Sequence, residues 1–147
     1  MKLQQLSLFL ENSPGQLRPP IDALARAGIN IVTLSLADTQ QFGILRLIVP
    51  DWQQARTVLE RAGCIVKVNE VLAIEVANQP GGLKRILEVV DRAGLNIEYM
   101  YAFTEKRGDK AMLVFRFTDP DAALTALKTA KINVLGEVDL FHRPPPT

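Results

Sequence analysis

An internal repeat constrains the fold of this chain more than any other feature of its sequence. Residues 12–17, Asn-Ser-Pro-Gly-Gln-Leu, recur 66 positions later at residues 78–83 as Asn-Gln-Pro-Gly-Gly-Leu. Nine of the 20 residues from position 12 onward are identical to their counterparts at this offset. Self-similarity of this kind indicates one structural unit that is present twice. We therefore predict two units, at residues 1–70 and 71–143, followed by a flexible tail at residues 144–147.

Each repeat predicts the same order of elements: strand, helix, strand, strand, helix, strand. Short apolar runs between turn residues are typical of strands, and apolar residues three or four positions apart are typical of a helix face. The predicted strands are residues 6–10, 30–37, 44–49 and 65–68 in the first copy, and 71–76, 96–103, 111–117 and 134–141 in the second. Asp51 and Asp119 are expected to cap the second helix of each copy. The predicted fold is α+β, with two tandem ferredoxin-like βαββαβ units, each an antiparallel sheet with its helices on one face.

The two copies differ in two places that bear on this fold. Pro19 and Pro20 stand where the second copy has Arg-Ile, and two prolines are expected to delay or distort the start of the first helix. In the second copy, Ile97, Tyr99 and Tyr101 alternate along one strand, whereas the first copy has its stronger apolar alternation on the opposite face. Either a β-bulge changes the register of this strand, or Tyr99 and Tyr101 face an interface.

The composition argues against several classes of function. The chain has 147 residues, of which 48% are hydrophobic, and 17 Lys and Arg against 16 Asp and Glu leave a formal charge of +1. This balance gives no strong field that would attract nucleic acid or an acidic membrane, so neither is expected as a partner. One cysteine and one histidine, His142, exclude a disulfide framework, a cysteine-based zinc site and a multi-histidine site. We predict a soluble cytoplasmic protein with no membrane span, no catalytic residues, no metal and no cofactor.

The recurring residues resemble a known family. A strand, then Asn-x-Pro-Gly-x-Leu, a helix, and Ala-Gly-(Ile/Leu)-Asn-Ile leading into a strand are similar to the ACT domain, a small amino-acid-binding regulatory module. The resemblance covers the chain twice, up to residue 143. It implies a non-catalytic regulatory protein that binds a small amino acid at interfaces between units and modulates a partner enzyme or its own association. Because a small unit with one bare sheet face is marginally stable, we also expect a homodimer or larger homo-oligomer.

The resemblance places the ligand at the two Pro-Gly loops, here called the first loop (residues 12–17) and the second loop (residues 78–83). A helix N-terminus attracts a carboxylate, and an Asn amide offers both a donor and an acceptor. By resemblance, the Asn at the far end of each first helix reaches a ligand held by a neighbouring unit. The candidate residues are Asn12, Gly15, Gln16, Leu17, Asn30 and Ile31, and in the second copy Asn78, Gly81, Gly82, Leu83, Asn96 and Ile97. Gly82 leaves more room than Gln16, which favours the second loop.

Alternative explanations remain open for both the residues and the function. Asn12 and Asn78 are also suited to capping a helix or forming an Asx turn. The alternative function is a ligand-free interaction or assembly module that acts on an enzyme in trans. RNA binding is disfavoured because residues 71–76 carry no aromatic side chain, and a small enzyme because no acid, base and nucleophile are clustered. An open cavity lined by Asn78 and Asn96 would favour a ligand, and apolar filling of that space would favour assembly alone.

Overall fold

The computed structural model describes residues 1–141, in which the chain forms two compact units. The N-terminal unit comprises residues 4–69, and the C-terminal unit comprises residues 1–3 and the chain from Glu70 onward. His142 and the predicted tail at residues 144–147 lie outside the described residues. Over residues 1–141, no helix has the length and apolar character needed to cross a membrane. In the same range, no group of three or more His, Cys, Asp or Glu side chains is placed to hold a metal ion.

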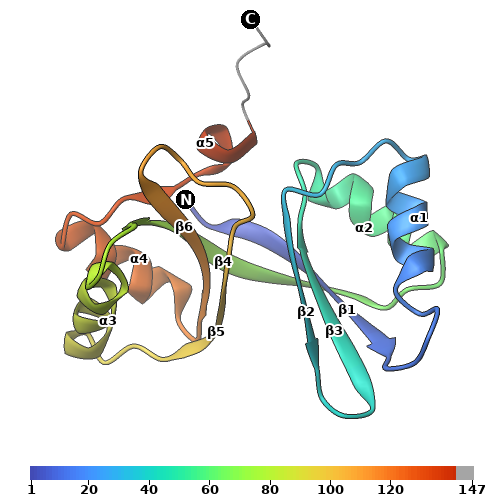
Figure 1. The fold of residues 1–147 in the computed structure, drawn as a ribbon, viewed down its shortest axis with the longest axis horizontal. Coiled ribbons are helices and arrows are strands. Elements are labelled where there is room, and N and C mark those ends of the chain that lie inside the picture. The colour runs from blue at the N-terminus through green and yellow to red at the C-terminus, as the bar shows by residue number, and fades with distance from the viewer. Residues whose placement is uncertain (142–147) are drawn as a thin grey trace, which may run out of the picture. The chain divides into compact units, whose positions relative to one another are not determined.

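The N-terminal unit has the predicted order of elements (Figure 1). Its elements are β1 (Leu3–Glu11), α1 (Arg18–Arg26), β2 (Thr33–Asp38), β3 (Phe42–Ile48), α2 (Trp52–Arg61) and the start of β4 (Val66–Ala77). The strand order is β2-β3-β1-β4, and both β1 and β2 pair antiparallel with β3. Alternate residues of β1 and β3 pack against α1 and α2 on one face of this sheet. The buried core consists of Leu6, Leu8, Leu24, Leu45, Leu47, Val49, Ala55, Leu59 and Val66.

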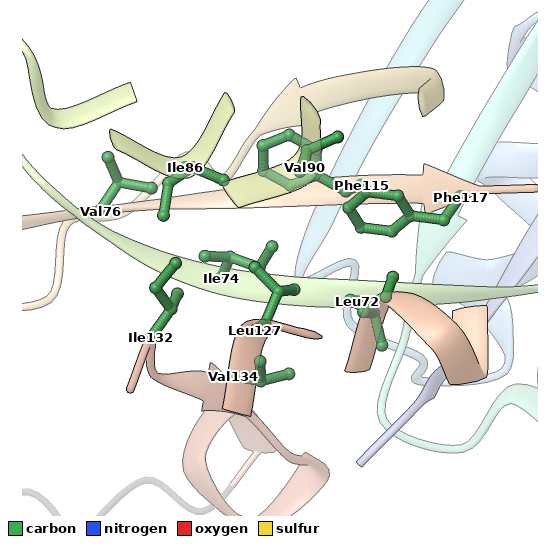
Figure 2. Close-up of a cluster of buried hydrophobic side chains, with 11 residues drawn as sticks. Leu72, Ile74, Val76, Ile86, Val90, Phe115, Phe117, Leu127, Ile132 and Val134 are labelled. Atoms are coloured by element: carbon green, nitrogen blue, oxygen red, sulfur yellow. The ribbon is translucent and has the colours of Figure 1, made fainter. Parts of the chain in front are cut away.

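The C-terminal unit repeats this arrangement from the rest of β4 onward. Its elements are α3 (Gly82–Arg92), β5 (Ile97–Ala102), β6 (Lys110–Phe117), α4 (Pro120–Thr129), β7 (Val134–Leu135) and a short α5 (Glu137–Phe141). The strand order is β7-β4-β6-β5. Figure 2 shows Ile86 and Val90 of α3 beside Phe115 and Phe117 of β6, whose rings stack 5.7 Å apart. The predicted pair of ferredoxin-like units, each with its helices on one face of an antiparallel sheet, is therefore confirmed.

The predicted caps and the proline effect are also confirmed. The carboxylates of Asp51 and Asp119 each accept a hydrogen bond of 3.1 Å from a backbone N–H three residues later. The helix α1 begins at Arg18, two positions later in the repeat than α3, which begins at Gly82. Pro19 and Pro20 follow Arg18 directly, so the first turn of α1 lacks two backbone donors.

Several predicted strands differ in extent from the structure, and β2, for example, begins at Thr33 and not at residue 30. The predicted strand at residues 134–141 is wrong beyond Leu135, because the chain turns at Gly136 and forms α5 instead. The Asp139 carboxylate accepts a hydrogen bond of 2.8 Å from the Gly136 N–H, and the Gly136 carbonyl accepts one from the Asp139 N–H. The predicted strands at residues 65–68 and 71–76 join into the single strand β4, whose residue Asn69 accepts a hydrogen bond from the Ser7 hydroxyl.

A register shift in β5 explains the unusual alternation of Ile97, Tyr99 and Tyr101. Ile97 pairs with Phe117, but Tyr99, two residues later, pairs with Arg116, which is only one residue earlier in β6. A β-bulge of this kind changes the face to which the following side chains belong. Ile97 consequently packs against the core, while Tyr99 and Tyr101 lie on the face opposite the helices. The β-bulge alternative is confirmed.

The end of α4 offers a test of backbone strain. The helices α1, α2 and α3 are each followed by a glycine with positive φ, whereas α4 is followed by Lys131 with φ of 59°. A left-handed conformation costs a residue with a Cβ about 1–2 kcal/mol, partly offset by the lower chain entropy of lysine in the unfolded state. Lys131→Gly is therefore expected to raise the free energy of unfolding by about 0.5–1 kcal/mol, measured by urea denaturation. The matched variant Gly94→Lys should lower the free energy of unfolding. A Lys131→Gly variant that is less stable than the original protein would contradict backbone strain at Lys131.

Candidate functional site

The first loop is attached to the turn between β2 and β3. The Asn12 side-chain amide donates a hydrogen bond of 3.1 Å to the Gln40 carbonyl, and the Asn12 backbone N–H donates one of 3.0 Å to the Gln41 carbonyl. Asn12 therefore holds the loop in place and does not cap α1, whose N-cap residue is Leu17. These bonds keep the loop close to the ends of three strands.

A pocket with a volume of about 230 Å³ lies beside this loop and is here called the first-loop pocket. It is lined by Leu10, Glu11, Asn12, Ser13, Gln16, Leu17, Leu36, Ala37, Asp38 and Gly43. All of these residues belong to the N-terminal unit. The pocket thus unites the end of β1 and the first loop with the end of β2 and the start of β3.

Gly43 lines the first-loop pocket from the start of β3. In the sheet, Gly43 of β3 is paired with Leu10 of β1 on one side and with Asp38 of β2 on the other. Gly43 lies two residues before the core residue Leu45 and therefore on the same, helix-facing side of β3. Because Gly43 has no side chain, the sheet is hollow at this point. A Cβ added there would lie 3.3 Å from the Leu36 Cδ1 atom.

The late start of α1 leaves this hollow open. Gln16 and Leu17 stand where α3 has its first two helical residues, yet in the first loop they precede α1 and line the pocket. Pro19 and Pro20 bring about this difference, since two consecutive prolines favour only the first turn of a helix. The same prolines remove N–H donors from the helix N-terminus that was expected to bind a carboxylate.

The second loop is packed against its own strand. Gly82 begins α3, and a Cβ added to Gly82 would lie 2.0 Å from the Ala77 carbonyl oxygen and 3.3 Å from the Val76 Cγ1 atom. The room that the sequence predicted for a ligand beside Gly82 is therefore occupied on this side by β4. In addition, the position equivalent to Gly43 in the second copy is Ala111, whose methyl group stands where Gly43 has no side chain.

The remaining predicted residues are dispersed. The Asn96 amide donates to the Thr118 hydroxyl at 3.0 Å within its own unit, and Asn30 and Asn78 are exposed. Gly15 and Gly81 have φ of 84° and 87°, and no atom lies within 4 Å of a Cβ added at either position. The positive φ, and not the close approach of another residue, therefore accounts for glycine at both positions. Ile31 and Ile97 pack against the cores, and Leu83 is exposed. Of the twelve predicted residues, the first-loop pocket brings together Asn12, Gln16 and Leu17.

Sequence reasoning missed the residues that β2 and β3 contribute. Leu36, Ala37, Asp38 and Gly43 carry no motif, and only the pairing of strands brings them to the loop. Asp38 places a carboxylate on the Gly43 side of the sheet, whereas Glu11, which pairs with Phe42, has its carboxylate on the opposite face, and no Lys or Arg lines the pocket. Within the described part of the chain, neither carboxylate forms an ion pair. The one feature of the sequence that could have pointed to this pocket is that Glu11 has no acidic counterpart in the second copy.

Comparisons with known proteins agree with this architecture. The family model of the ACT domain pair matches residues 1–143. Protein BT0572 from Bacteroides thetaiotaomicron is 36% identical over 96% of each chain, with a TM-score of 0.89. The regulatory subunits of aspartate kinase from Thermus thermophilus and Thermus flavus are 19% and 21% identical, with TM-scores of 0.62 and 0.59. The matches cover 86% and 87% of this chain and 91% and 92% of those chains, and at this identity they show a shared fold. No curated protein matches the sequence.

Proposed function

Because the chain belongs to the ACT domain pair family, we propose that it is a non-catalytic regulatory protein that binds a small amino acid. Binding modulates a partner enzyme or the protein's own association in the cytoplasm. The observation that carries the proposal is the first-loop pocket, with its volume of about 230 Å³. Drug-sized ligands occupy pockets of about 300–1,000 Å³, so this pocket suits a smaller molecule.

The lining of the pocket matches the chemistry of an amino acid. Asn12, Ser13 and Gln16 supply both hydrogen-bond donors and acceptors, which an α-carboxylate and an α-ammonium group require. Leu10 and Leu36 provide apolar surface for a side chain. Small-molecule sites commonly combine apolar walls with a few polar groups that orient the ligand.

Exposed apolar residues near the pocket support a role for association. Leu17, Leu34 and Leu36 are 40%, 41% and 55% exposed, and two of them line the pocket. Burial of this surface by a second copy or a regulated enzyme would close the pocket over its ligand. Ligand binding and association would then stabilise each other, since each favours the state that the other requires.

A thermal-shift screen of the twenty amino acids at millimolar concentration tests the function. A ligand at about 100 times its Kd adds about 2.7 kcal/mol of stability, which raises the Tm of a small protein by several degrees. We expect a rise with one chemically related group of amino acids, and a change in sedimentation with the same ligand. A flat panel would contradict amino-acid binding and favour the ligand-free interaction module, which the close packing at Gly82 supports for the C-terminal unit.

The variant Asn78→Ala tests the second loop separately. Asn78 is exposed and does not cap α3, whose N-cap residue Gly81 has no side chain, so its loss should leave the Tm of the free protein nearly unchanged. Because we assign the ligand to the first-loop pocket, Asn78→Ala should also keep the full ligand-induced shift in Tm. Loss of the shift in this variant would instead place the ligand at the second loop, with the predicted residues Gly81, Gly82 and Asn96.

A further inference from the structure

The charge of the first-loop pocket carries information about its ligand. Asp38 is paired with Gly43 and lies two residues after Leu36, so it belongs to the same, helix-facing side of the sheet. Asp38 therefore stands at the edge of the hollow above Gly43, whereas Glu11, which also lines the pocket, pairs with Phe42 and has its side chain on the opposite face of the sheet. Asp38 forms no ion pair among the described residues and no Lys or Arg lines the pocket, so its carboxylate leaves the pocket with one unbalanced negative charge.

A neutral amino acid does not balance this charge. Its α-ammonium group compensates only its own α-carboxylate, so the negative charge of Asp38 remains in excess. A second amino group on the ligand would remove that excess, and Leu10, Leu17 and Leu36 offer apolar surface for the methylene groups that connect the two. Long aliphatic chains with a charged end bind in this way, with the stem on apolar surface and the amino group near water.

We propose that the first-loop pocket selects an amino acid whose aliphatic side chain ends in a cationic amino group, and that Asp38 is its principal specificity-determining residue. The inference rests on the proposed function and adds the class of ligand. Asn12, Ser13 and Gln16 donate to the α-carboxylate, and Asp38 accepts hydrogen bonds from the ammonium group at the end of the side chain.

Binding of lysine and norleucine, measured by calorimetry on the full chain, tests this inference. Norleucine has the same straight side chain as far as its terminal carbon and lacks the amino group, so the ratio of the two affinities isolates the cationic group. An exposed ion pair contributes up to about 1 kcal/mol, or about fivefold in Kd. We expect lysine to bind about threefold to fivefold more tightly than norleucine, and higher ionic strength to reduce only the lysine affinity.

Charge-removing variants assign the effect to a residue. Asp38→Asn should weaken lysine binding about threefold to fivefold and leave norleucine binding unchanged, and Glu11→Gln should have the smaller effect. The control Asp91→Asn removes the same charge from an exposed position on α3 in the C-terminal unit and should change neither affinity. Equal affinities for lysine and norleucine, unaffected by Asp38→Asn, would overturn the ligand class while the proposed function stands. Absence of binding by any amino acid would overturn both.

Discussion

Gly43→Val is expected to abolish the rise in Tm that an amino acid produces, while the protein stays folded. Gly43 lines the first-loop pocket, and a valine side chain would occupy the space between Leu10, Leu36 and Asp38. We expect Kd to rise about tenfold or more, measured by calorimetry with the ligand that the screen identifies.

The free protein should tolerate this change well. The nearest atom to an added Cβ is Leu36 Cδ1 at 3.3 Å, the end of a side chain that is 55% exposed and free to move. Valine also favours a strand more than glycine does, so stability should change by no more than about 1 kcal/mol. The control Ala111→Val alters the equivalent position in the other unit and should keep the ligand-induced shift. Full binding by Gly43→Val would mean that the ligand does not occupy this pocket.

Gly82→Ala should be strongly destabilising, by about 3 kcal/mol or more in urea denaturation. The new Cβ would lie 2.0 Å from the Ala77 carbonyl oxygen, so α3 must move away from β4, and the buried contacts of Ile86 and Val90 would loosen with it. Because the clash is with backbone, no side-chain rotation relieves it.

The repeat supplies a matched control for this variant. Gln16 occupies the position equivalent to Gly82, already has a Cβ and is exposed in the first loop. Gln16→Ala should therefore change the free energy of unfolding by less than about 0.5 kcal/mol. If Gly82→Ala were as stable as the original protein, close packing against Ala77 would not explain the glycine at this position, and a ligand site beside Gly82 would regain support.

The architecture was predictable from the sequence because its signals are local and occur twice. The repeated Asn-x-Pro-Gly-x-Leu segments, the helix-ending glycines and the caps Asp51 and Asp119 each act over a few neighbouring residues. The same is true of Pro19 and Pro20, whose fixed φ and missing N–H groups delay α1 whatever surrounds them. The resemblance to the ACT domain rested on these segments, and the family match confirms it.

The pocket, in contrast, was decided by tertiary structure. Leu10, Asp38 and Gly43 meet only because β1 and β2 pair with β3 in one particular register, and a shift by one residue would turn each side chain to the other face. The sequence alone favoured the second loop because Gly82 is small. In the structure, Gly82 is required because α3 lies close to the Ala77 carbonyl. No pattern among neighbouring residues of the sequence indicates this close approach. The order of elements was thus determined by residues close in the chain, and the shape and charge of the pocket by residues that only strand pairing brings together.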